Sequence, residues 1–140
     1  MISIREVAKL AGVSPATVSR VMNGTARVDP EKAKRVMEAI EQTEFVPNEV
    51  ARSLFKKSAK MIGLIIPSIR NPFFTQMASY IDETARRMGS RVFLSEVGSG
   101  DLERERAALQ MLTSMNADGI ILASTNDDIQ PYVEQCRLPV

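Results

Sequence analysis

Residues 3–23 predict two short helices joined by a tight turn, which is the pattern of a helix-turn-helix. Ala8 is small enough for a second helix to cross close to it, Gly12 suits a turn with a positive φ angle, and Val18 would fill the wedge between the helices. Such a spacing of small and apolar residues is common by chance. The prediction therefore depends on whether each helix also carries its own start and stop signals.

The first helix has a signal at each end. Ser3 and Glu6 fit a capping box, in which each side chain accepts a hydrogen bond from the backbone of the other residue. The helix is therefore expected to begin at about residue 4, and Gly12 is expected to end it. Its apolar stripe consists of Ile4, Val7, Ala8, Leu10 and Ala11.

The next two helices begin in a similar way. Ser14 is a favourable N-cap and Pro15 suits the first helical position, so a second helix over about residues 15–22 is expected. Asp29 and Pro30 repeat this combination for a third helix that reaches about residue 43. Three helices of this size predict one small helical domain over residues 1–46.

The exposed turns of the second helix carry side chains that suit DNA. Arg20 can donate two hydrogen bonds to one guanine, and the methyl groups of Ala16 and Thr17 can contact thymine methyl groups. Hydroxyl groups can bind phosphates or base edges. Because any surface helix can show such residues, the prediction depends on the capped helix pair that carries them. The predicted DNA contacts of this region are Ser3, Ser14, Pro15, Ala16, Thr17, Ser19, Arg20 and Asn23.

The charged residues are unevenly distributed. The whole chain has a formal net charge of +1, but residues 1–60 contain 11 Lys and Arg against 7 Asp and Glu, whereas residues 61–140 contain 7 against 10. A basic segment beside a mildly acidic one is typical of a phosphate-contacting module joined to another domain. For charge taken alone, chance fluctuation is the alternative interpretation.

Residues 47–60 predict a short connecting helix. Pro47 ends the preceding helical region, Asn48 can cap a new helix, and residues 49–56 contain apolar pairs four residues apart. A helix of under three turns is marginal in water on its own. Because the basic linker that follows offers little to pack against, we expect the folding of this helix to depend on a partner.

From residue 61 the pattern changes to an alternation of strands and helices. Strands are expected at 62–66, 91–97 and 119–123, and helices at about 73–88, 102–115 and 129–136. Apolar strands that alternate with helices predict a parallel α/β sheet. Residues 138–140 look like the start of a fourth strand. Because a sheet that stopped there would expose an edge, we expect the chain to be a fragment of a longer protein.

The composition weakens the membrane, metal and enzyme classes. The longest uncharged apolar run, Met61 to Ile69, is far shorter than the roughly 20 residues that span a bilayer, and the N-terminus has no cleavable signal pattern. We therefore expect a cytoplasmic protein. The single cysteine, Cys136, and the absence of histidine remove common metal ligands and the commonest general base. The glycines of residues 98–100 do not complete a phosphate-binding pattern. We expect no metal, no cofactor and no enzymatic activity.

Five segments carry a resemblance to known proteins, at residues 4–24, 47–54, 62–67, 71–74 and 117–121. In this order they resemble the lactose-repressor/galactose-repressor family of bacterial transcription regulators. The resemblance covers essentially the whole chain. It implies a helix-turn-helix headpiece over residues 1–46, a hinge helix with its linker over 47–60, and an incomplete α/β domain over 61–140 that is like the N-terminal subdomain of a periplasmic binding protein.

The resemblance also implies how DNA is bound. Members of this family bind operator DNA as dimers, with one headpiece in each major-groove half-site and the paired hinge helices in the minor groove between them. Pro15, Ala16 and Arg20 fall on the base-reading positions. Leu54 matches the hinge leucine that enters the central base step, and Ala51 would face the groove floor one turn earlier. Without the resemblance, packing of Leu54 against the α/β domain is the favoured interpretation.

The effector cleft of this family lies between two subdomains, at the carboxyl ends of the strands, as expected for open parallel sheets. Asn71, Phe73 and Ser124 are the candidates for contacts with a small, sugar-like effector. For Phe73, core packing is an equally good interpretation. The second subdomain is absent from these residues, so the candidates would form only half of a pocket.

The sequence therefore predicts a sequence-specific DNA-binding transcription regulator, a repressor, that acts as a homodimer and whose full-length parent responds to an effector. Two alternatives remain open. The first is a sugar-binding module without regulatory DNA binding, which the missing signal peptide weakens. The second is a nucleotide-dependent α/β enzyme, which the missing phosphate-binding loop and histidine weaken.

Overall fold

The computed structural model describes the backbone of residues 1–140 and all side chains except those of residues 54–56. The chain divides into two compact units, Met1–Asn48 and Glu49–Val140, which are described separately. Among the described helices, none combines the length and the apolar character of a transmembrane span.

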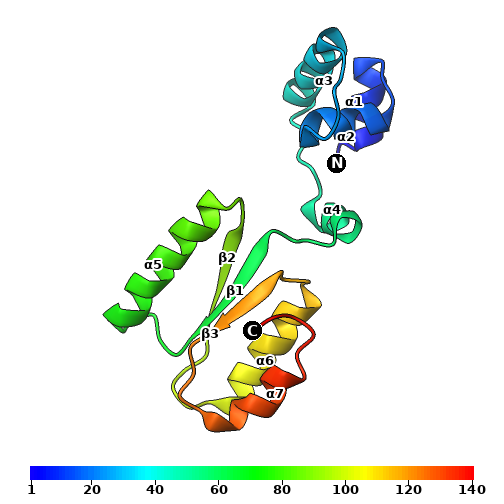
Figure 1. Ribbon diagram of the computed structural model, residues 1–140. Coiled ribbons are helices and arrows are strands. Elements are labelled where there is room, and N and C mark those ends of the chain that lie inside the picture. Colours follow the sequence, from blue (N-terminus) through cyan, green and yellow to red (C-terminus); the bar gives the residue numbers. More distant parts are fainter. The chain divides into compact units, whose positions relative to one another are not determined.

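Three helices form the N-terminal unit, as predicted: α1 (Ile4–Ala11), α2 (Pro15–Asn23) and α3 (Pro30–Thr43) (Figure 1). Gly12 ends α1 with a φ angle of 68°, which is the left-handed conformation that the turn requires. Ala8 and Val18 are 1% and 0% exposed, so they lie in the core between the helices as the spacing predicts. The core residues are Val7, Ala8, Ala11, Val18, Val36 and Ala39.

Side chains cap all three helices of this unit. The Oγ atom of Ser3 accepts a hydrogen bond from the Glu6 backbone N–H at 3.4 Å, and Glu6 Oε2 accepts one from the Ser3 N–H at 2.6 Å. Ser14 Oγ accepts from the Thr17 N–H at 3.2 Å, and Asp29 Oδ1 accepts from the backbone of the second residue of α3 at 3.4 Å. These contacts satisfy backbone donors that the first turn of a helix leaves unpaired.

Because of the capping box, the stability of this unit should vary with pH in the acid range. The Ser3 backbone N–H and then the Ser3 hydroxyl group lower the pKa of the Glu6 carboxyl group below its ordinary value of 4.5. Because the pKa is lower in the folded state, ionised Glu6 stabilises that state above the unfolded-state pKa, and the contribution is lost as pH falls through the folded-state pKa. We expect Glu6→Gln to unfold at a slightly lower temperature than the parent near neutral pH.

Thermal unfolding followed by far-ultraviolet circular dichroism at a series of pH values measures this effect. The difference between the two proteins should shrink as pH is lowered and disappear once the carboxyl group is protonated in both states. A difference that stays constant over the whole acid range would show that the charge of Glu6 plays no part.

The second unit is an α/β structure. Its helices are α4 (Glu49–Lys56), α5 (Pro72–Arg87), α6 (Leu102–Ser114) and α7 (Gln130–Glu134), with a 3-10 turn, η1 (Asp127–Ile129), before the last. Its strands are β1 (Met61–Ile66), β2 (Arg91–Glu96) and β3 (Gly119–Leu122). They form one parallel sheet in the order β2-β1-β3, in which Leu64 lies opposite Leu94 and Ile121. The predicted parallel sheet is confirmed.

Helices cover the two faces of the sheet. Helix α5 lies on one side, and α6 and α7 lie on the other (Figure 1). The core on the α6 side contains Ile65 and Leu112, both fully buried, together with Val97, Ala108, Leu109, Ala117, Ile120 and Ile129. Gly63, in the central strand, faces Leu112 so closely that a Cβ atom there would overlap the leucine side chain. The absence of a side chain at residue 63 therefore allows α6 to approach the sheet.

Strand β2 is an edge strand of the sheet, and its Phe93 and Leu94 are 36% and 40% exposed. Two expectations about this unit need correction. The helix expected at 129–136 is shorter and begins with the turn η1. In the described chain, residues 138–140 form no strand, although the Pro139 carbonyl accepts a hydrogen bond from the Ile120 N–H at 2.8 Å.

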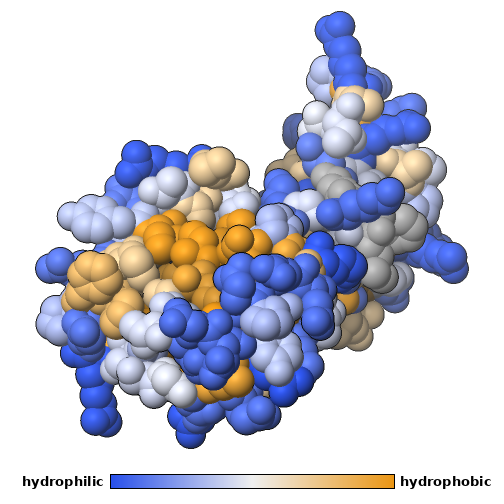
Figure 2. Space-filling model, turned by 60° about the horizontal axis from the view of Figure 1, so that its bottom comes forward, coloured by the Kyte–Doolittle hydropathy of each residue, from blue (hydrophilic) through white to orange (hydrophobic). Residues whose placement is uncertain are grey.

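The α5 side of the sheet has an open apolar area. A shallow hollow there is lined mainly by Ile62, Tyr80, Ile81, Met88, Ile121 and Val140. A hydrophobic area of this unit is visible in Figure 2. Met88 lies three residues after Ala85, a spacing that puts both side chains on one helical face, but Met88 is 79% exposed whereas Ala85 is buried.

Candidate DNA-binding surface and effector edge

Helix α2 presents one side to the core and another to solvent. Val18 is fully buried, while Pro15, Ala16 and Arg20 are exposed. Residues 16 and 20 are one helical turn apart, so both can face the same partner. In the described part of the chain, the Arg20 guanidinium group has no hydrogen-bond or ion-pair partner. All of its donors are therefore available for a ligand.

The hydroxyl-bearing candidates on α2 already make local contacts. Ser14 Oγ lies 3.0 Å from Thr17 Oγ1, and Asn23 Nδ2 donates to Ser19 Oγ at 3.1 Å. Thr17, Ser19 and Asn23 are partly buried. These contacts hold the side chains in place, and a hydroxyl group that accepts a hydrogen bond, as Ser19 does, keeps an O–H that can donate to a backbone phosphate oxygen. Ser3 caps α1 and is exposed.

The other two predicted DNA contacts lie in α4. Ala51 is exposed, and the Arg52 and Glu49 side chains form an ion pair of 3.0 Å along the helix. The side chain of Leu54 lies outside the described residues. Residues 51 and 54 are three positions apart on the helix, so they share one face.

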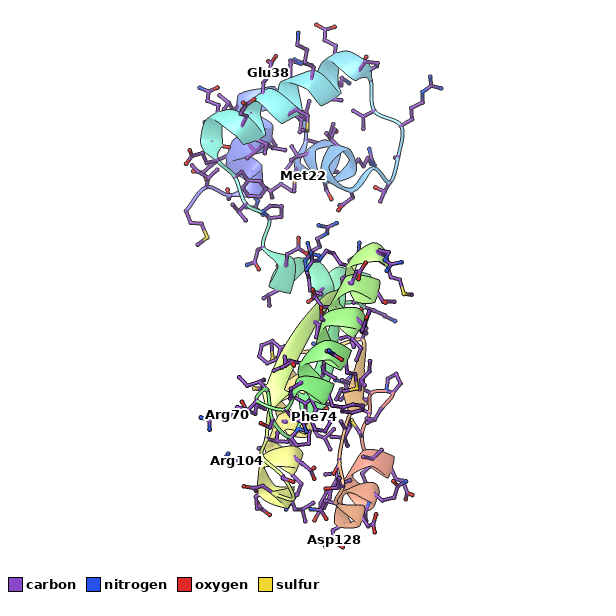
Figure 3. All side chains as sticks on the ribbon, turned by 90° about the vertical axis from the view of Figure 1, so that its left-hand side faces the viewer. Met22, Glu38, Arg70, Phe74, Arg104 and Asp128 are labelled. Atoms are coloured by element: carbon purple, nitrogen blue, oxygen red, sulfur yellow. The ribbon has the colours of Figure 1, made fainter. Side chains whose placement is uncertain are left out.

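The effector candidates follow two neighbouring strands. Asn71 and Phe73 lie in and after the loop that follows β1, and Ser124 lies in the loop that follows β3. Because β1 and β3 are adjacent and parallel, the two loops meet at one edge of the sheet, which we call the carboxyl edge. Figure 3 shows Arg70, Phe74, Arg104 and Asp128 at this end of the unit.

Asn71 and Phe73 differ in how freely their side chains could contact a ligand. Asn71 caps α5, because its Oδ1 atom accepts a hydrogen bond from the Phe73 N–H at 3.0 Å. Phe73 is 66% exposed, and its ring meets the Phe74 ring edge-on at a centroid distance of 5.1 Å. The core interpretation of Phe73 therefore does not fit this structure. Its ring is free to stack on a ligand.

Ser124 is engaged by a buried carboxylate that we did not predict. Its hydroxyl group donates to Glu105 Oε1 at 2.5 Å and accepts from the Asn126 N–H at 3.0 Å. Glu105 is only 1% exposed, and its Oε2 atom has no hydrogen-bond partner in the described structure. A signal was present in the sequence, because Glu105 falls on the apolar stripe of α6 that contains Ala108, Leu109 and Leu112.

Loss of the Ser124 hydroxyl group should therefore reduce stability. In Ser124→Ala the Glu105 carboxylate stays buried with no hydroxyl donor, so we expect a loss of about 1–3 kcal/mol in the free energy of unfolding. Urea unfolding measures it. Ser99→Ala, at an exposed loop hydroxyl, is the matched control and should change stability by less than about 0.5 kcal/mol. Unchanged stability with a weakened effector affinity would instead make Ser124 a ligand contact.

The described residues contain no cluster of three or more Cys, Asp or Glu side chains that could hold a metal ion. One unit thus presents an exposed helix-turn-helix surface, and the other presents a carboxyl edge with the exposed ring of Phe73. Both units match known protein families.

Residues 3–48 match the family model described as bacterial regulatory proteins, lacI family. Residues 59–140 match the model described as periplasmic binding proteins and sugar binding domain of LacI family. The chain belongs to the LacI family. The resemblance inferred from the sequence is thereby confirmed, and a family of regulatory proteins agrees with the expectation that this member is not an enzyme.

Relatives within the LacI family align along the whole chain. The ribose operon repressor of Halalkalibacterium halodurans is 41% identical over 140 residues, and the sucrose operon repressor of Pediococcus pentosaceus is 38% identical over 137 residues. These alignments cover 42% and 41% of the two relatives. The chain thus spans less than half the length of the relatives it matches.

A solved structure has the same arrangement of elements. The crystal structure of the Lac repressor dimer bound to operator and the anti-inducer ONPF superposes with a TM-score of 0.88 at 28% sequence identity. The match covers 99% of this chain and 43% of that one. The predicted fold, a helix-turn-helix headpiece followed by part of a periplasmic-binding-protein-like domain, is confirmed.

Proposed function

We propose that this LacI-family chain is the DNA-binding part, and the first part of the effector domain, of a transcriptional repressor that binds double-stranded operator DNA as a homodimer in the cytoplasm. The observation that carries the proposal is the exposed surface of the capped helix α2, on which Arg20 has no partner in the described structure. It stands in a chain that is 41% identical to a ribose operon repressor over all 140 residues. If the protein were a sugar-binding module without DNA binding, this exposed surface of α2 would have no role.

In the proposed complex α2 lies in the major groove. Ala16 and Arg20 contact base edges, and the Ser14, Thr17, Ser19 and Asn23 side chains contact the phosphate backbone together with Ser3. Pro15 lies at the N-terminal end of α2, where residues enter the groove first. A unit of three helices reads only one half-site. Useful specificity therefore requires two copies at a fixed spacing, which supports the homodimer.

The hinge would connect DNA binding to the effector. Helix α4 has eight residues and is marginal alone, so we propose that it folds fully when two copies meet in the minor groove. There Leu54 would enter the central base step and Ala51 would face the groove floor. A small, sugar-like effector would bind the carboxyl edge at Phe73, with Asn71 and Ser124 nearby. In this proposal residues 1–46 are the headpiece, residues 47–60 are the hinge helix with its linker, and residues 61–140 are the incomplete α/β domain.

Selection of bound sequences from a random pool of DNA duplexes tests the proposal. The protein at its full natural length should enrich an approximately palindromic site with a central CG-type step, since the two hinge leucines would enter one step. Failure to enrich any site would refute sequence-specific regulation. Hydrogen exchange of the α4 amides should also slow when the selected duplex is added, and equal exchange with and without that duplex would refute the hinge mechanism.

A further inference from the structure

A single carboxylate from a distant part of the chain holds the linker between α4 and β1. Asp118 Oδ2 accepts a hydrogen bond from Ser58 Oγ at 2.8 Å, and Asp118 Oδ1 accepts one from the Ala59 N–H at 3.1 Å. Ser58 Oγ also accepts from the Lys60 N–H at 3.2 Å. We call Ser58, Ala59, Lys60 and Asp118 the linker junction. Three of its four members are consecutive, and the fourth, Asp118, directly precedes β3.

The linker backbone follows a path that its own sequence does not favour. Lys57 and Lys60 have φ angles of 54° and 49°, in the left-handed region. For a residue that is neither glycine nor asparagine, this conformation is unfavourable, because the Cβ atom comes too close to the following carbonyl oxygen. Two such residues within four positions persist only where other contacts hold them. The hydrogen bonds of Asp118 and Ser58 supply such contacts.

The linker junction is also tied to all three strands at their amino ends. The Lys60 carbonyl accepts a hydrogen bond from the Arg91 N–H, which begins β2, at 2.9 Å. Met61 begins β1, and its carbonyl accepts a hydrogen bond from the Asp118 N–H at 2.8 Å. The Asp118 side chain therefore extends from a backbone that is itself fixed in the sheet. This amino edge is opposite the carboxyl edge, where the effector candidates lie.

We propose that Asp118 is a positioning residue that fixes the exit of the hinge helix to the sheet. Helix α4 ends at Lys56 and the linker junction begins at Ser58, so only Lys57 lies between them. A displacement of the amino end of β3 would reach the hinge through one residue. This inference rests on the proposed function, because it assigns the linker junction a role in operator binding.

The physical consequence is a smaller entropic cost of forming the hinge on DNA. With the linker junction intact, residues 58–60 are ordered before DNA binds. Without it they would be a free tether, and their ordering would have to be offset by operator contacts. Binding of a random duplex, which needs no folded hinge, would not carry this cost.

The test measures affinity for the selected operator and for a random duplex in the protein at its full natural length. Asp118→Ala should weaken operator binding on the order of ten-fold, the equivalent of one strong or two ordinary hydrogen bonds, and leave random-duplex binding unchanged. Asp118→Asn keeps an oxygen that can accept from the Ala59 N–H, so it should restore part of the loss. Asp128→Ala, which removes an exposed carboxylate at the carboxyl edge, is the charge-matched control.

A double-mutant cycle separates positioning from simple support of the sheet. Because Ser58 and Asp118 share a hydrogen bond, Asp118→Ala should have a smaller effect on operator affinity in a Ser58→Ala background. A purely structural role predicts a lower unfolding temperature with an unchanged ratio of operator to random-duplex affinity, and that result would overturn the proposal. If Asp118→Ala does not fold, Asp118→Asn and Ser58→Ala give the same comparison.

Hydrogen exchange without DNA distinguishes failure of this inference from failure of the proposed function. Residues 58–60 should exchange slowly in the free parent protein and faster in Asp118→Ala. If the parent selects no operator, the proposed function fails while this exchange result still stands. If the parent selects an operator but the variant shows unchanged exchange and unchanged affinity, the linker junction has no positioning role.

Discussion

Replacement of Leu112 with alanine is expected to lower the free energy of unfolding of the α/β unit by about 2–5 kcal/mol. Leu112 is 0% exposed and lies in the core between α6 and the sheet. Its truncation removes apolar contacts and leaves a cavity that the sheet can fill only partly, because β1 is hydrogen-bonded on both sides. This is the largest effect on stability that we predict.

Gly63 packs against Leu112, and a larger side chain at residue 63 should overfill the space that Leu112→Ala would leave empty. Gly63→Ala adds a methyl group that overlaps the Leu112 side chain, so we expect a loss of about 1–3 kcal/mol from overpacking. In the double variant the new methyl group enters space that Leu112→Ala has vacated. The combined loss should therefore be smaller than the sum of the two single losses.

Urea unfolding followed by tyrosine fluorescence measures these changes in the stability of the α/β unit. The two tyrosines, Tyr80 and Tyr132, both lie in the α/β unit, and the chain has no tryptophan. Met111→Ala, next to Leu112 but 39% exposed, is the matched control and should lose less than either core variant. Strictly additive losses for the pair would show that the close approach of α6 does not depend on Gly63.

Local chemistry accounts for the parts of the fold that the sequence predicted well. The capping residues Ser3, Ser14 and Asp29 act within three residues along the chain, and Gly12 has the positive φ angle that its turn requires. Such signals are complete within a short segment. The helices of the N-terminal unit could therefore be placed to within a residue or two, and Arg20 could be placed on the exposed side of α2.

Contacts between distant residues could not be predicted in this way. Ser124 is predicted from the sequence as an effector contact, but its hydroxyl group donates a hydrogen bond to Glu105, 19 residues earlier. The bond between Asp118 and Ser58 joins residues 60 positions apart. Neither pair has a sequence pattern of its own, because each depends on how the helix and the strands are packed. Met88 shows the same limit, since its helical spacing indicates a buried face that this part of the chain leaves uncovered.

The largest effect on DNA binding is expected for Arg20→Ala. If Arg20 donates two hydrogen bonds to one guanine, the variant should lose about 1–3 kcal/mol of binding free energy on the selected operator. It should also relax the preference at one base pair in each half-site, which a repeated selection with the variant would reveal. Lys34→Ala is the matched control, because it also removes one positive charge and its side chain is 77% exposed on α3.

Arg20→Lys distinguishes a base contact from a phosphate contact. Lysine keeps the positive charge but loses the planar pair of donors, so it should not restore affinity if Arg20 reads a guanine. If Arg20 binds a phosphate, lysine should restore most of the affinity, and Arg20→Ala should weaken all duplexes equally while the salt dependence of binding falls by about one unit of slope. The two outcomes exclude each other, because only a base contact makes the loss depend on the DNA sequence.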